Sequence, residues 1–599
     1  MKGFDVLKVK SAVKTRNRFD LSRTHLTTMD FGEIVPLFVE ETVPGDKFTV
    51  TADYFARLAP LVKPTYGKFS FRTVSAFVPY HQIAVDAEAW LAGKTTMEGQ
   101  TPHHRYFTIG ALHQFLVSYC ITTTGATASN ADYTYLDGSG NVVNAIFTDT
   151  GKYWVKILVA LGYSLPSNVN TQTGSTWNTG VASMKLSAYP LLAFFKLYND
   201  YMSQSQRFNS SALSDVLYRI KNGLAYTGIW SSSTGEISPG GMNALFSNIF
   251  LNYDNDYFTS AWQNPNCAIN SIESISTFNV PGSNPSNSNA GKGGTSTYDS
   301  YLETNGSGST QYVKYIGQRA LDFLKSFDDW VRRNNYSGSR AVQQIYSRFG
   351  IKPDDFRAHY AHVISTDNIP VQVGDVTATA GFTDAQGTDV ALGDYSGKGI
   401  MNGAKSISYS CDDFGVLFIF GYFTVVPMMA YGFDRRVLRN TPLDYYNPEF
   451  DGLGAEAISY AEIYTNPLAA GDSADSSSDD SVFGFTERYN SYRYGRDVIS
   501  GEFRNYHPGG DMNVWHTGRN LNALRKGGTM IAQSSAMNTL PQSNSEYNRI
   551  FSYTAGDIDH FYMTARFKVD AVRPMLNLNQ VPNLGEGDTL VPRNGNVIS

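Results

Sequence analysis

Alternation of apolar and polar residues predicts several β-strands in this chain. The clearest lies near the C-terminus, where one face of a strand would carry Phe561, Met563, Ala565, Phe567 and Val569 and the other would carry the polar residues between them. A second alternation begins at Phe69 and runs to Val78. The cluster Pro44-Gly45-Asp46 predicts a turn between apolar runs that end near Val39 and begin at Phe48. These patterns indicate a mainly β fold.

The most apolar stretch of the chain is FGVLFIFGYFTVVPMMA, residues 414–430. Its length is borderline for a membrane-spanning helix. Asp412 and Asp413 precede it, Pro427 interrupts it, and its β-branched and aromatic residues favour strands. We therefore expect one or two fully buried strands here and no membrane insertion.

Helical periodicity is confined to a few segments. Apolar residues recur every three or four positions between Ile316 and Val331, which predicts an amphipathic helix over residues 313–334. A shorter helix is expected to start at Ser339 as N-cap and to end just before Gly350. A third is expected over Tyr189–Met202, with Pro190 in its first turn.

Three stretches rich in Ser, Thr, Asn and Gly are expected to be insertions between strands. They cover residues 121–150, 203–248 and 268–312. The run 281–297 has almost no apolar residues and cannot bury a core. The acidic run 471–481 is expected to be a solvated loop. Long loops on a β-scaffold often carry recognition, but linkers have the same composition, so both interpretations stay open.

Composition narrows the class of protein. Aromatic residues make up 14% of the 599 residues and charged residues only 17%, against roughly 25% in an average soluble protein. Low charge with many aromatics suits a protein whose surface is covered by partners, and it also suits a large β-rich enzyme or binding protein. The cysteines at 120, 267 and 411 are far apart and predict buried free thiols rather than a disulfide framework or a zinc site.

Residues 1–25 form a basic segment in a chain whose formal net charge is −6. Such an arm can neutralise phosphates without reading base sequence, although a solvated terminus has the same composition. No apolar h-region of a secretion signal follows its basic residues. The candidate nucleic-acid-binding residues of this arm are Lys8, Lys10, Lys14, Arg16, Arg18 and Arg23.

Signatures of catalysis are absent from the sequence: it contains no HExxH, GxxxxGK[ST], GxSxG or GxGxxG motif. His359 and His362 have a spacing that could serve a metal, but no further ligand completes the set. Asp254 and Asp256, and the carboxylates of 471–481, do not match a calcium loop. We therefore predict no catalytic residue, no metal and no cofactor, although paired carboxylates of a glycosidase would not be visible in one sequence.

Five phrases, in order along the chain, resemble the major capsid proteins of microviruses. They are FDLSRTHLTTMDFGEIVPLFVEETVPGD (19–46), FVPYHQI (77–83), DYFTSAWQNPN (256–266), DYYNPEFDGLGAE (444–456) and ERYNSYRYGRDVISGEFR (487–504). The segment AWQNPN lacks the proline-rich tail usual in the family, and the polar insertions are longer than the basic plan of the family. The chain is therefore more similar to gokushovirus-like or related gut microviruses than to the enterobacterial type.

The resemblance implies an eight-stranded antiparallel jelly-roll barrel with long loop insertions and a few helices. It implies one capsid domain over 26–599 after the basic arm, with an extended C-terminal arm near 571–599. It also implies self-assembly of sixty copies into a T=1 icosahedral shell around a circular single-stranded DNA genome. A repeated contact that closes by symmetry gives such a shell, whereas one that does not close gives a filament.

The same resemblance implies the partners and location of the protein. Internal scaffolding, DNA-binding and pilot proteins of the virus are expected, as is a host receptor bound by a surface protrusion, which we assign first to 268–312 and second to 121–150. The protein is expected in the virion, assembled in the bacterial cytoplasm. Two alternatives stay open from the residues themselves, a glycan-binding surface or phage fibre protein and a secreted polysaccharide hydrolase.

Overall fold

The protein is represented by a computed structural model. It describes residues 16–94, 101–137, 139–166, 179–202, 212–247, 360–377, 395–428, 432–451, 455–462, 482–504, 512–518, 547–552 and 559–575, with short pieces between 249 and 261, 302 and 350, 382 and 390, and 525 and 530. Strands outnumber helices, and the named strands all pair antiparallel. The expected mainly β class is therefore confirmed.

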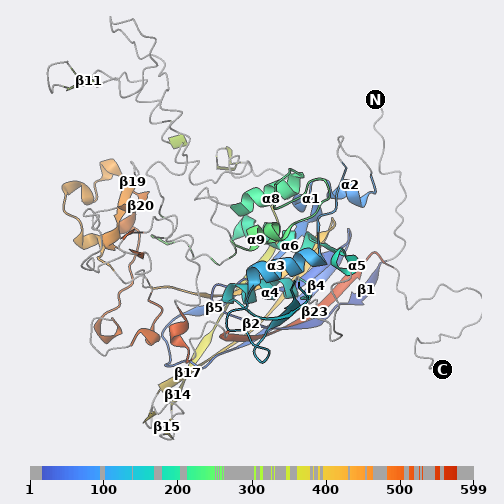
Figure 1. Cartoon of the computed structure of the whole chain (residues 1–599). Coiled ribbons are helices and arrows are strands. Elements are labelled where there is room, and N and C mark those ends of the chain that lie inside the picture. The colour runs from blue at the N-terminus through green and yellow to red at the C-terminus, as the bar shows by residue number, and fades with distance from the viewer. Residues whose placement is uncertain are drawn as a thin grey trace, which may run out of the picture.

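Two sheets dominate the structure (Figure 1). Sheet A consists of β1 (Asn17–Asp20), β2 (Arg23–Met29), β23 (Phe561–Arg573), β4 (Lys47–Leu58), β17 (Tyr395–Ser410) and β14 (Gln372–Thr377). β1 and β2 both pair with β23, which is followed by β4, β17 and β14. Sheet B has the order β13 (His362–Pro370), β5 (Phe69–Pro79), β18 (Gly415–Val425) and β3 (Val35–Thr42).

The two sheets share one hydrophobic core. Alternate residues of β4 and β23 pack against those of β3, β5 and β18, and all are buried. The ring of Phe423 in sheet B stacks on that of Phe561 in sheet A with centroids 3.9 Å apart. Period-two alternation produces this arrangement, because every second side chain of a strand points to the same face. The expected strand around 561–570 is confirmed as β23.

A second core lies on the other face of sheet B, where helices cover it (Figure 1). The covering layer contains α1 (Tyr80–Ile83), α3 (Ile109–Phe115), α4 (Asp149–Ala160), α6 (Tyr189–Tyr201), α8 (Ala212–Asn222) and α9 (Pro239–Phe246). All eleven residues of β18 are buried, because one face meets sheet A and the other meets the helices. This confirms the expectation of a buried strand in 414–430. No described helix is long and apolar enough to cross a membrane.

Two of the segments expected to be insertions between strands contain regular secondary structure. Residues 212–246 hold α8 and α9, whose buried residues include Leu213, Val216 and Leu245. Residues 121–147 form a small sheet of β7 (Ile121–Thr122), β9 (Val142–Phe147) and β8 (Tyr133–Leu136). Both segments are rich in Ser, Thr, Asn and Gly, but their apolar residues recur at the spacing of a helix or strand and pack against the core.

Of the other segments expected from the sequence, one helix is confirmed and the rest lie largely outside the described residues. The helix expected over Tyr189–Met202 is confirmed as α6, with Pro190 in its first turn. The helices expected over 313–334 and up to Gly350, the acidic run 471–481 and nearly all of 268–312 lie outside the described residues. Within 268–312 the structure describes only β11 (Leu302–Thr304) and the start of β12 (Gln311–Val313).

The remaining strands form small two-stranded antiparallel sheets beside the two large sheets. They are β6 (Tyr106–Thr108) with β10 (Lys185–Ser187), β15 (Phe382–Thr383) with β16 (Asp389–Val390), β19 (Ala455–Ser459) with β20 (Val482–Glu487), and β21 (Arg525–Lys526) with β22 (Thr529–Met530). Further short helices are α2 (Ala87–Leu91), α5 (Thr179–Ala182), a π-helical turn at Leu116–Cys120 and several 3-10 turns between Arg435 and Ile550. The β19–β20 hairpin lies to one side of the two large sheets (Figure 1).

Candidate nucleic-acid interface

The face of sheet A that points away from sheet B has many exposed side chains. Strand registers fix which of them are neighbours: Phe55 on β4 lies between Thr564 on β23 and Asn402 on β17, and Arg57 lies between Tyr562 and Ile400. On one face of an antiparallel sheet such cross-strand partners have Cβ atoms about 5 Å apart. The outward face is therefore a continuous surface of defined composition, which we call the sheet A face.

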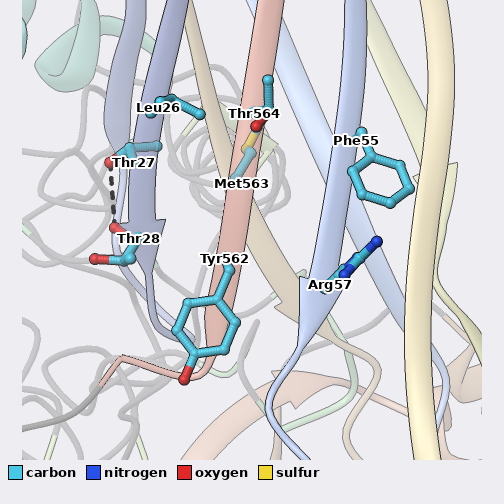
Figure 2. A pocket seen from close by; sticks show the side chains of 8 residues that line it. All are labelled: Leu26, Thr27, Thr28, Phe55, Arg57, Tyr562, Met563 and Thr564. Carbon is cyan, nitrogen blue, oxygen red and sulfur yellow. Dashed lines mark hydrogen bonds between the residues drawn. The ribbon is translucent and has the colours of Figure 1, made fainter.

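Aromatic and apolar side chains of this face line a shallow groove. The groove is bounded by β2, β23 and β4, and its volume is about 680 Å³. Leu26 is 73% exposed, Tyr562 46% and Phe55 38%. Figure 2 shows Phe55 and Arg57 projecting from β4 beside Tyr562 and Thr564 of β23, with the Arg57 guanidinium 5.5 Å from the Phe55 ring centre. Flat rings and a cation are thus presented together to solvent.

The sheet A face is cationic although the whole chain is anionic. The outward positions of β4, β17 and β23 carry five cationic side chains, Lys47, Arg57, Lys398, Arg566 and Lys568. They carry two carboxylates, Asp53 and Asp570. The chain as a whole has a net charge of −6. Such a local excess of positive charge attracts polyanions over a Debye length.

The arm residues proposed from sequence have different surroundings. Arg18 in β1 donates to Asp570 at 3.0 Å, and this bond raises the pKa of Arg18. Arg23 in β2 pairs with Glu40 at 3.0 Å and lies over the Phe38 ring. Arg16 is exposed next to β1. Residues 17–25 therefore belong largely to sheet A, and Lys8, Lys10 and Lys14 lie outside the described residues.

The other candidate sites have structural partners. His362 in β13 lies 3.1 Å from the Tyr409 hydroxyl, and Asp254 accepts two hydrogen bonds from Arg72 at 2.9 and 2.8 Å. Asp256 accepts from the backbone N–H of Phe258, and His359 lies outside the described residues. The part of the chain that the structure describes contains no group of three His, Cys, Asp or Glu residues fit for a metal ion. Cys120 and Cys411 are free and buried, and burial raises the pKa of each thiol to about 12.

Sequence reasoning missed the rings of the sheet A face. The segment KFTVTADYFARL (47–58) alternates so that Phe48, Val50, Ala52, Tyr54 and Ala56 face the core. Phe55 falls on the polar side of that pattern, as Tyr562 does in β23. An aromatic residue on the polar side of an otherwise regular alternation was the available signal.

Comparison with known proteins identifies the family. The family model described as "Capsid protein (F protein)" matches residues 7–102 and 316–584, which is more than half of the chain. This chain belongs to that capsid protein family. The matched residues contain all ten strands of sheets A and B, whereas the unmatched stretch 103–315 contains α3, α4, α6, α8 and α9 of the helical layer.

Two relatives of the capsid protein match almost end to end. Capsid protein VP1 of Chlamydia phage 1 is 24% identical over 621 aligned positions, and the match covers 95% of each chain. Capsid protein VP1 of Bdellovibrio phage phiMH2K is 23% identical over 611 positions, again covering 95% of each. The predicted resemblance to microvirus capsid proteins is confirmed, and the protein is a structural component of a bacteriophage virion.

Proposed function

We propose that this capsid protein is the major coat protein of a microvirus, and that sixty copies close into a T=1 shell around a circular single-stranded DNA genome. Two relatives named capsid protein VP1, both from phages, match 95% of the chain and support this proposal. Closed symmetry lets many identical and individually modest contacts give a stable particle.

The proposed shell-forming unit is an eight-stranded jelly roll. The chain order of strands supports it: β2, β4, β17 and β23 lie in sheet A, whereas β3, β5, β13 and β18 lie in sheet B. The spatial orders are β2-β23-β4-β17 and β3-β18-β5-β13, so strands distant in sequence are neighbours in both sheets. This order of strands in two packed sheets supports the proposal of a double-sheet jelly roll.

The sheet A face is the proposed genome contact, together with the basic arm that precedes β1. One observation supports this proposal most strongly. The sheet A face is cationic, has exposed aromatic rings, and is covered by no layer of the described structure. Lysine and arginine bind the phosphates of a nucleic acid whatever its base sequence, and aromatic rings stack on unpaired bases. Sheet B does not offer such a face, because sheet A and the helices bury both of its sides.

Electron microscopy of the purified full-length protein tests the coat function. Uniform closed particles are the expected result, whereas only small discrete oligomers under all assembly conditions would refute the shell. The particles should contain nuclease-protected single-stranded DNA. The ratio of their ultraviolet absorbance at nucleic-acid and protein wavelengths, and sequencing of their contents, would measure it.

Two substitutions test the sheet A face separately from assembly. Lys568→Glu should weaken binding of a fluorescent oligothymidylate and reduce the magnitude of the slope of log affinity against log salt by about 0.7 for the lost phosphate contact. Tyr562→Leu should lower the affinity by the roughly 1–3 kcal/mol of one lost stacking contact while leaving the slope unchanged. Lys94→Glu, an equal charge reversal beside α2, is the control. Wild-type affinity and slope in both sheet variants would refute this contact.

The polar insertions are proposed to face the host. Residues 268–312 are the first candidate for a receptor-binding protrusion, and 121–150 the second. Deletion of 268–312 should preserve particles and reduce phage adsorption to the host; undiminished adsorption would refute this role. Scaffolding, DNA-binding and pilot proteins of the virus are the proposed further partners, and assembly is proposed to occur in the host cytoplasm.

A further inference from the structure

A second exposed surface lies in the irregular region that flanks the β19–β20 hairpin. It is built from short 3-10 helices at Arg435–Val437, Pro442–Asp444, Pro448–Phe450 and Asn490–Tyr492. The side chains that form it are Leu443, Tyr445, Tyr446, Phe450 and Tyr492 together with Arg439 and Arg488, and we call it the tyrosine–arginine surface. Each of its five apolar members is between 38% and 55% exposed.

Contacts between side chains hold this surface in one arrangement. The Arg439 guanidinium lies 3.8 Å from the centre of the Tyr492 ring, and the Tyr492 hydroxyl accepts from the backbone N–H of Tyr446 at 3.2 Å. Arg488 lies 5.1 Å from the centre of the Phe450 ring. Asp444 accepts from the backbone N–H groups of Asn440 and Thr441 at 3.0 and 2.7 Å. These contacts hold the irregular backbone of the tyrosine–arginine surface in place although no described long helix or sheet supports it.

The backbone beneath the surface is also tightly determined. Tyr489 has φ of 61°, the one positive φ among the described non-glycine residues. A bulky residue adopts this conformation only where its surroundings impose it. Tyr489 is 2% exposed, its ring contacts Tyr446 and Tyr492, and its N–H donates to Glu456 at 2.7 Å. The surface is therefore preorganised, which lowers the entropy cost of binding a partner.

The charge of this surface is balanced and does not favour the genome as its partner. Residues 434–451 and 487–493 contain five arginines, at 435, 436, 439, 488 and 493. They contain five carboxylates, at 434, 444, 449, 451 and 487. Several of these pair with each other, as Arg493 does with Asp451 at 2.8 Å. A balanced surface offers a polyanion no net attraction, in contrast to the sheet A face.

The exposed area matches one side of a protein–protein contact. Four aromatic side chains of roughly 200 Å² each, about half exposed, together with Leu443, present on the order of 450 Å² of apolar area. One partner of a standard interface buries about 800 Å², of which about 57% is apolar, or again about 450 Å². Tyrosine and arginine are also the residues that dominate interface energetics.

We propose that the tyrosine–arginine surface is a contact between neighbouring copies of this chain, and Tyr445 is its most exposed apolar member. The inference rests on the proposed function, since a coat protein must present matched surfaces to its own copies. The surface then makes a protein contact with a neighbouring copy, while the sheet A face contacts the genome. Adjacent copies would cover the aromatic rings in the particle and leave them exposed in the free subunit.

Substitution of Tyr445, which is 55% exposed, tests the contact in the full-length protein. Tyr445→Glu should reduce the fraction of protein in closed particles at least tenfold, measured by sedimentation velocity and electron microscopy, because a carboxylate cannot be buried unpaired in the contact. Tyr445→Phe keeps the apolar area and should assemble like wild type. Tyr218→Glu on α8, at a site 59% exposed, is the matched control and should also assemble.

Tyrosine nitration followed by mass spectrometry provides a second measurement on unmodified wild-type protein. Tyr445 should react at least fivefold more slowly in particles than in free subunits. Equal reaction rates, wild-type assembly of Tyr445→Glu, or an equal assembly defect in Tyr218→Glu would each overturn the contact. If the wild-type protein formed no particles at all, the proposed shell would fail and this inference with it; particles combined with any of the first three results would overturn the inference alone.

Discussion

At the scale of single residues, a partly buried ion cluster links the helical layer to the sheets. Lys156 on α4 donates to Glu33 at 2.7 Å and to Asp559 at 2.8 Å, and the Glu33 side chain is only 13% exposed. Burial raises the pKa of Glu33 from 4.5 to about 7, despite the opposing effect of Lys156. Nothing in the local sequence reveals this cluster, because its three members are separated by more than a hundred residues.

This raised pKa predicts a pH-dependent stability. Between about pH 4.5 and 7 the folded state binds more protons at Glu33 than the unfolded state does, so the free energy of unfolding should fall as the pH rises through that window. The upper limit of the loss is about 3 kcal/mol. Glu33→Gln should flatten this dependence in urea titrations, and Glu88→Gln, at an exposed site, should not. An unchanged slope in Glu33→Gln would contradict the assignment.

At the scale of elements, close packing between the sheets depends on a glycine in β18. An ideal Cβ atom on Gly421 would lie 2.4 Å from Cζ of Phe71 and 2.9 Å from Cδ1 of Leu37. Phe71 cannot turn away easily, since its ring packs on Tyr54 and Phe423. Gly421→Ala should therefore destabilise the protein by about 1–3 kcal/mol through overpacking.

Urea denaturation followed by circular dichroism measures that change. The control is Gly374→Ala in β14, because the nearest atom to its ideal Cβ, the Lys398 carbonyl oxygen, is 4.0 Å away. Equal midpoints for the two variants would show that the side chains of Phe71 and Leu37 can shift to accept a methyl group at Gly421.

The element scale is also where sequence prediction worked best. Alternation in 561–570, the apolar run of β18 and the helix at Tyr189 are local patterns, and each is confirmed. Pairing is not local: β2 meets β23 across more than 500 residues, with Leu26 opposite Thr564. The sheet A face could not be assembled from sequence because it requires these registers. The helices α8 and α9 were missed because the Ser-, Asn- and Gly-rich residues around them indicated an insertion.

At the scale of the whole molecule, the three layers give the chain two different sides. Helices bury the far face of sheet B, whereas no described element covers the cationic face of sheet A, which continues into β1. The phrases that carried the family resemblance lie largely in the two sheets and around the tyrosine–arginine surface. They predicted the kind of protein, but not which of its surfaces would be free.

This arrangement predicts different effects for two truncations of the basic arm. Removal of residues 1–15 deletes Lys8, Lys10 and Lys14 but leaves β1 and β2 intact, so particles should form and retain less DNA, measured by their absorbance ratio.

Removal of residues 1–25 also deletes β1 and the first three residues of β2. It exposes part of the backbone edge of β23, and an unpaired edge favours aggregation. The longer truncation should therefore lower particle yield as well. Normal DNA content after removal of 1–15 would leave the sheet A face as the sole proposed genome contact, and normal particles after removal of 1–25 would show that pairing of β23 with β1 and the start of β2 is dispensable for the shell.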